Sequence, residues 1–100
     1  MWLPPARARL RRVTQWLGRI APIFAAKWVQ RVADATANIS ALPEIGEPLV
    51  DEAFAGQILR EIVVKPYRLV YRCDGSECYV VAIIDTSKQF ARELMIEDLF

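Results

Sequence analysis

Apolar residues recur with the period of an α-helix along the first part of the chain. One stripe, spaced by three and four positions, consists of Leu10, Val13, Leu17 and Ile20. A second stripe follows Pro22, stops before Pro43, and consists of Trp28, Val32, Ala35, Ile39 and Leu42. Because proline can start a helix but does not continue one, and because the connector is short, the pattern predicts two antiparallel helices that form a hairpin.

The pattern changes to that of β-structure after residue 57. Three segments of about seven residues, "ILREIVV", "YRLVYRC" and "CYVVAII", are rich in β-branched and aromatic side chains. Lys65-Pro66 and Asp74-Gly75 separate them, which predicts a three-stranded antiparallel meander. Residues 43–57, "PEIGEPLVDEAFAGQ", have no sustained period and predict an extended loop. Thr86 and Gln89 have the spacing of a capping box, which predicts a short C-terminal helix.

These elements predict a single α+β domain over residues 1–100, in which the helical hairpin covers one face of the sheet. The first residues, "MWLPPARARLRR", lack the continuous apolar core of a secretory signal. The longest apolar window, "IAPIFAA", is far shorter than the roughly 20 residues that span a bilayer. A cytoplasmic protein without a membrane partner is therefore expected.

The residue inventory excludes several kinds of chemistry. The chain has no histidine and two cysteines, so neither a zinc site nor a Ser-His-Asp triad can be built, and no metal or cofactor is expected. Cys73 and Cys78 flank "DGSE", and a tight turn there would place them opposite each other on adjacent strands, where a disulfide is possible. Because the cytosol is reducing, free thiols are expected.

If Cys73 faces Cys78, strict alternation assigns the two faces of the hairpin. The pairs expected on the side of the helices are Tyr71 with Val80, Leu69 with Ala82, and Tyr67 with Ile84. The opposite face combines Arg68, Val70, Arg72, Tyr79, Val81 and Ile83. A surface with this mixture of apolar and cationic side chains is too apolar to face water alone, so a covering partner is expected.

Charge is distributed unevenly along the chain. Residues 1–33 hold seven Lys or Arg and no acid, whereas residues 34–55 hold five acids and no base. A basic helical surface of this kind suggests an acidic protein or nucleic acid as partner, with a solvated helix face as the alternative. On the sheet, Arg60, Lys65, Arg68 and Arg72 suggest a face that binds acidic protein or phosphate. The alternative is that Arg68 pairs with a carboxylate such as Glu61 and packs its stem on the sheet.

The segments "LREIVVKPYRLVYR" and "YVVAII", with "ALPEIGEPL" before them, resemble the ParE/RelE superfamily of type II toxin-antitoxin toxins, the ParE branch in particular. The resemblance runs from about Trp2 to Phe90, and "PYRLVY" and "LPEIG" are its most specific parts. It implies a bacterial toxin that forms a hetero-oligomer with a cognate antitoxin. ParE-like members trap DNA gyrase, whereas RelE-like members cleave mRNA on the ribosome. The family usually opens with a full strand, which "MWL" would abbreviate.

The residues expected to contact antitoxin or target are Arg60, Lys65, Arg68, Val70, Arg72, Tyr79, Val81, Ile83 and Lys88. A RelE-like ribonuclease would use Arg60, Arg68 and Lys88 on phosphate, with Tyr67 or Tyr71 for proton transfer. Because Glu61 opposes phosphate binding and both tyrosines are expected to face the core, a non-enzymatic gyrase inhibitor is the first interpretation. "DTSK", residues 85–88, replaces a basic segment of ParE-like chains, so a protein that binds antitoxin with reduced toxicity is a further alternative.

Overall fold

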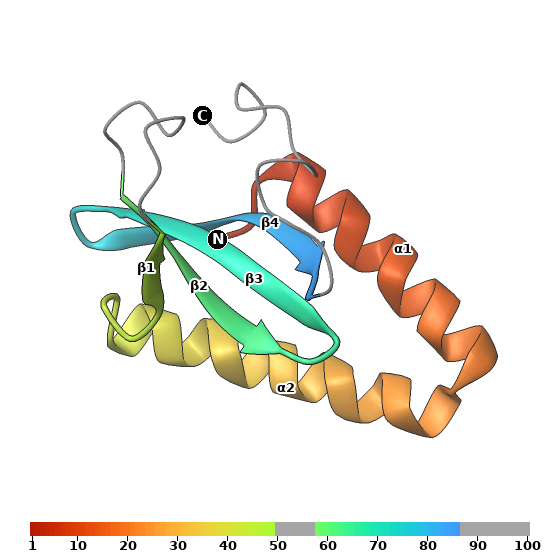
Figure 1. Cartoon of the computed structure of the whole chain (residues 1–100). Helices are drawn as coiled ribbons and strands as arrows, with labels where there is room; N and C mark the ends of the chain where they lie inside the picture. The colour runs from red at the N-terminus through yellow and green to blue at the C-terminus, as the bar shows by residue number, and fades with distance from the viewer. Residues whose placement is uncertain (50–57, 87–100) are drawn as a thin grey trace.

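The chain folds into a layer of helices packed on an antiparallel sheet (Figure 1). The computed structural model describes residues 1–49 and 58–86. Their elements are α1 (Pro4–Ile20), α2 (Pro22–Ala41), β1 (Glu47–Leu49), β2 (Leu59–Val64), β3 (Tyr67–Asp74) and β4 (Glu77–Asp85). The strands of the described part form one sheet in the order β1-β2-β3-β4, in which each strand is antiparallel to its neighbour. The predicted α+β class is confirmed.

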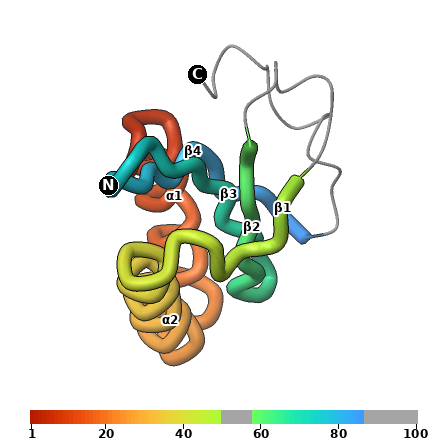
Figure 2. The backbone as a smooth tube through the Cα atoms, turned by 90° about the vertical axis from the view of Figure 1, so that its left-hand side faces the viewer, coloured from red at the N-terminus to blue at the C-terminus, as the bar shows by residue number. Residues whose placement is uncertain are grey.

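The predicted helical hairpin is present, and proline begins each of its helices. Only Ala21 separates α1 from α2, and both helices lie on the same side of the sheet (Figure 2). Most of the two predicted stripes is buried against the strands, including Val13, Leu17 and Trp28. Ile20 and Leu42 are exposed instead, because one ends α1 at the tip of the hairpin and the other follows the last residue of α2.

The register of β3 with β4 follows the prediction at one end and departs from it at the other. Cys73 faces Cys78 and Tyr71 faces Val80, but Leu69 faces Ile83 and Tyr67 faces Asp85. The predicted pairs Leu69 with Ala82 and Tyr67 with Ile84 were therefore wrong. The reason is a β-bulge: Val81 is an extra residue on β4 between the partners of Tyr71 and Val70, and it shifts every later pair by one.

Both sides of the sheet are apolar. Ile83 joins Tyr67 and Leu69 in the cluster beneath the helices, so its predicted position on the charged face was wrong. The opposite side has its own buried cluster, which consists of Leu59, Val70, Val81, Ala82 and Ile84, with Leu3 and Leu49 packed against it. Val70 and Val81 are thus buried within the fold, and the exposed apolar surface that alternation predicted at these residues is absent.

The first residues of the chain extend the sheet on the outer side of β4. Trp2 forms a parallel bridge with Val80. The Leu3 amide donates to the Val80 carbonyl at 3.0 Å, and the Val80 amide donates to the Met1 carbonyl at 2.8 Å. This bridge corresponds to the abbreviated first strand that the sequence led us to expect.

The segment predicted as an extended loop contains a strand. Glu47, Pro48 and Leu49 of β1 face Glu61, Arg60 and Leu59 of β2. The prediction of a loop over 43–57 was therefore wrong at 47–49, where the chain pairs with β2. The predicted C-terminal helix, which would begin near Thr86, lies outside the described residues. Within the described part, neither helix is apolar enough over a sufficient length to cross a membrane.

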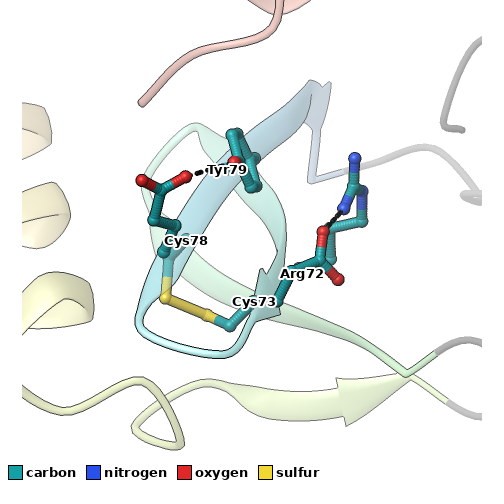
Figure 3. A network of polar contacts seen from close by, with 6 residues as sticks. Arg72, Cys73, Cys78 and Tyr79 are labelled. Atoms are coloured by element: carbon teal, nitrogen blue, oxygen red, sulfur yellow. Dashed lines mark hydrogen bonds and ion pairs between the residues drawn. A yellow bond between two sulfur atoms is a disulfide. The ribbon is translucent and has the colours of Figure 1, made fainter.

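The tip of the β3–β4 hairpin carries a disulfide (Figure 3). Cys73 and Cys78 are joined by an S–S bond of 2.07 Å, and their Cα atoms are 4.0 Å apart. The expectation of free thiols is corrected because the register places the two residues directly opposite each other, within bonding distance.

Candidate partner-binding surface

The predicted cationic residues do not share one face of the sheet. Arg68 and Arg72 project from β3 on the side away from the helices, whereas Arg60 faces Tyr71 and projects on the helix side. The Arg60 guanidinium donates to the carbonyl oxygens of Gly46 at 3.0 Å and of Glu44 at 3.4 Å. Arg60 therefore holds the loop before β1. Because neighbouring residues of a strand point to opposite faces, alternation along the sequence also places Arg60 and Glu61 on different faces of the sheet.

Arg68 is ion-paired on the sheet. Its guanidinium donates to a Glu61 carboxylate oxygen at 3.2 Å, and both side chains are 18% exposed. Alternation along β2 and β3 brings the two residues to the same face, as the alternative considered for Arg68 requires. Part of the positive charge assigned to this face is thus neutralised by a neighbouring strand.

Arg72 occupies the disulfide end of the same face. It forms an ion pair with Asp74, and its guanidinium carbon lies 5.0 Å from the centre of the Tyr79 ring on β4 (Figure 3). Among the described residues its Nε has no hydrogen-bond partner. The Tyr79 hydroxyl donates to the Glu77 carboxylate, and this bond raises the pKa of Tyr79 above its ordinary value. The hairpin tip therefore presents a cation, an aromatic ring and carboxylates side by side.

The nine residues expected to contact a partner fall into distinct groups. Arg68, Arg72 and Tyr79 share one face, which we call the β3 cationic face. Lys65 is exposed at the turn between β2 and β3. Val70, Val81 and Ile83 are buried and unavailable to a partner, Arg60 is on the other face, and Lys88 lies outside the described residues.

The loop before β1 is fixed by a tyrosine from the middle of the sheet. The buried Tyr71 hydroxyl donates to the Pro43 carbonyl at 2.8 Å and accepts a hydrogen bond from the Gly46 amide at 2.8 Å. A Cβ at Gly46 would lie 2.7 Å from the Tyr71 ring and 2.8 Å from the Glu61 carbonyl, so only glycine fits. Sequence analysis missed this contact, although a tyrosine on a buried face is a sign that its hydroxyl has a partner.

Tyr71 and Gly46 join "PYRLVY" to "LPEIG", the two segments that carry the sequence resemblance. A family model of the ParE toxin of type II toxin-antitoxin system, parDE, matches residues 1–90. The chain belongs to this ParE toxin family. It is accordingly the toxin component of a type II toxin-antitoxin system. No curated protein matches the sequence significantly.

In this ParE family toxin, Tyr67 lies in the core beneath the helices. Its ring meets the Trp28 ring edge to face, with centres 5.5 Å apart, and the Trp28 indole donates to the Val64 carbonyl at 3.0 Å. Burial is the main cause that raises the pKa of Tyr67, and the negative charge of Asp85 raises it further. The positive charge of Arg9 lowers it. A hydroxyl in this environment keeps its proton at neutral pH.

The described part of the ParE family toxin offers little for metal binding. No three carboxylates or cysteines within residues 1–49 and 58–86 come together as a candidate metal site. Both cysteines in this part are in the disulfide, which leaves no thiolate there as a ligand.

Proposed function

We propose that this toxin acts by inhibiting DNA gyrase, without catalytic turnover, and that its cognate antitoxin neutralises it in the bacterial cytoplasm by covering the β3 cationic face. The family supplies the toxin role and the antitoxin as partner. Gyrase as the target is what the resemblance to ParE-like chains implies, and the placement of the arginines and tyrosines supports a mode of action without catalysis.

The observation that carries the proposal is the separation of Arg60 from Arg68. A ribonuclease needs several cations around one phosphate to stabilise the charge that develops on it. These two side chains project from opposite faces of the sheet, and Arg60 is bound to carbonyl oxygens of the preceding loop. They do not converge on one phosphate, which favours an inhibitor over a RelE-like nuclease.

The tyrosines favour the same conclusion. A proton-transfer residue has to reach the substrate and to have a pKa near the working pH. Tyr71 is buried and its hydroxyl is engaged by Pro43 and Gly46. The pKa of Tyr67 is raised further from neutrality, first by burial and then by the charge of Asp85. Neither residue is suited to act as a general base.

The β3 cationic face suits an antitoxin segment that carries carboxylates and an apolar or aromatic side chain. Arg68 and Arg72 would exchange or share their present carboxylate partners, Glu61 and Asp74, with those of the antitoxin. Tyr79 offers a ring for packing beside them. The resulting complex is a toxin-antitoxin hetero-oligomer.

A direct test combines purified toxin with gyrase and relaxed plasmid DNA, and measures supercoiling and the amount of cleaved DNA held by the enzyme. Toxin pre-mixed with its antitoxin is the matched control. We expect loss of supercoiling with accumulation of cleaved complexes, and recovery in the control. Unimpaired supercoiling, together with cleaved mRNA after expression in a bacterial host, would replace the proposal by the ribonuclease alternative.

Expression of the toxin alone distinguishes a gyrase inhibitor from a ribonuclease and from a toxin fold with reduced toxicity. We expect growth arrest with filamentous cells and intact mRNA. Normal growth with folded, antitoxin-binding protein would identify a toxin fold with reduced toxicity, the alternative raised by Asp85 and the residues after it. Chromosome morphology and mRNA integrity, read from the same cultures, distinguish the three cases.

A further inference from the structure

A cleft lies between α1 and the beginning of β3. It has a volume of about 180 Å³ and is lined by Arg9, Arg12, Val13, Trp16 and Tyr67. The four helical residues are spaced by three, one and three positions, so they lie along one side of α1. This arginine–tryptophan cleft is formed by residues that the β3 cationic face does not include.

The two arginines of the cleft differ from those of the sheet in their surroundings. Arg68 and Arg72 have carboxylate partners, whereas Arg9 and Arg12 have no side-chain hydrogen bond or ion pair among the described residues. The Nε of Arg9 is shielded from solvent without an acceptor. No acid occurs in residues 1–33, so α1 cannot neutralise the pair from within. An anion that entered the cleft would supply the missing acceptors.

The walls of the cleft add a hydrogen-bond donor and a flat apolar surface. Tyr67 brings its phenol to the cleft and keeps its proton at neutral pH, so it can donate to an anion. The Trp16 side chain is 48% exposed, which is a large apolar area for a residue flanked by arginines. Asp85, whose field reaches Tyr67, opposes an anion, but Arg9 and Arg12 together outweigh its single charge.

The combination points to a nucleic acid with unpaired bases. The cleft is smaller than the roughly 300 Å³ at which small-molecule pockets usually begin, but it can admit a phosphate group. A tryptophan ring beside such a phosphate can stack on a base only when that base is not already stacked in a duplex. Arg7 on the same helix is exposed, so the positive surface extends beyond the cleft.

We propose that the arginine–tryptophan cleft binds single-stranded DNA, with Arg9 and Arg12 on a backbone phosphate, Tyr67 donating to the same phosphate and Trp16 stacked on the adjoining base. This site goes beyond the proposed function and does not require that gyrase be the target. In this proposal DNA binds the basic surface of α1, and the antitoxin binds the β3 cationic face.

The test is fluorescence anisotropy of a labelled oligothymidylate of about 12 nucleotides, within the usual site size for single strands, titrated with the full chain. The variant is Arg12→Gln, and the matched control is Arg11→Gln, because both arginines are exposed on α1 and only Arg12 lines the cleft. We expect Arg12→Gln to weaken binding about tenfold and to reduce the salt slope by about 0.7, and Arg11→Gln to weaken it about twofold or less. Trp16→Ala should weaken binding at least about fivefold.

Several results would overturn the proposal. Equal losses in Arg11→Gln and Arg12→Gln would show diffuse attraction to a basic helix instead of a site. Unchanged affinity in Trp16→Ala would show that no base stacks on Trp16. If the unaltered chain did not bind the oligonucleotide at about 50 mM salt, single-stranded DNA would not be a ligand of the cleft. Competition by duplex DNA as effective as that by single strands would contradict the requirement for unpaired bases. Thermal melting of each variant confirms that it is folded before its affinity is compared.

Discussion

The Gly46 amide donates a 2.8 Å hydrogen bond to the buried hydroxyl of Tyr71. The two residues come from segments 25 positions apart, and the same hydroxyl also binds the Pro43 carbonyl. The loop that leads from α2 into β1 is thereby fixed to the centre of the sheet. The stability of this loop should depend on the hydroxyl oxygen of Tyr71 and on the absence of a side chain at Gly46.

Tyr71→Phe removes the hydroxyl while keeping the ring. We expect the free energy of unfolding to fall by about 1 to 3 kcal/mol, because the Gly46 amide and the Pro43 carbonyl lose a buried partner. Urea unfolding measures the change. Tyr79→Phe is the control, since that hydroxyl bonds to an exposed carboxylate, and it should change stability by less than about 0.5 kcal/mol. Equal effects of the two variants would contradict the role assigned to Tyr71.

Gly46→Ala should destabilise the protein by about 1 to 3 kcal/mol, because the added methyl group would lie 2.7 Å from the Tyr71 ring. Gly18→Ala serves as the matched control. Gly18 is within α1 and has open space around it, so alanine there should stabilise the helix by about 0.5 to 1 kcal/mol. The opposite signs can be read from thermal melting of the two variants, and a Gly46→Ala protein as stable as the parent would refute the close contact.

Arg68→Glu combined with Arg72→Glu should weaken antitoxin binding by about 2 to 5 kcal/mol, because it reverses the charge that meets the antitoxin carboxylates. Isothermal titration calorimetry with the cognate antitoxin measures the change. The control combines Arg11→Glu with Arg31→Glu, which alters the net charge equally at exposed helical positions. Because Glu61 would lose its ion pair, folding of the variant is checked by circular dichroism. Unchanged affinity would place the antitoxin on another surface.

Reduction of the Cys73–Cys78 disulfide should lower the free energy of unfolding by about 2 kcal/mol. The cysteines are five positions apart, so the bond closes a short loop and restricts the unfolded chain only modestly. Urea unfolding with and without dithiothreitol gives the difference. The double variant Cys73→Ala, Cys78→Ala should be insensitive to the reductant. Two thiols that react in the folded, unreduced protein would show that the bond does not form.

Much of the fold could be predicted because periodicity reports burial directly. The stripes through Val13 and Trp28 identified the helices, and alternation along β3 placed Tyr67 and Tyr71 on the core side. The bulge at Val81 could not be found in this way. Every residue of "VVAII" is apolar, so a shift of one position changes the face of each side chain without changing the pattern.

The candidate surface was less predictable than the fold because its partners are partly backbone atoms. Arg60 binds the carbonyl oxygens of Glu44 and Gly46. Because every residue has a backbone carbonyl, the sequence does not indicate which of them an arginine will bind. β1 was missed for a related reason, since three residues including Pro48 pair with β2 and form no periodic pattern of their own. The Arg68–Glu61 pair, by contrast, joins two charged side chains, and it was among the alternatives considered.

Within residues 1–49 and 58–86, positive charge is concentrated on one helix, which the net charge of +1 conceals. α1 carries five arginines and no acid, and it lies apart from β1 (Figure 1). In the field of a polyanion such a molecule rotates as it diffuses, so that α1 leads the approach. The first encounter with a nucleic acid complex would then be oriented before any specific contact forms, and its rate would fall as salt is added.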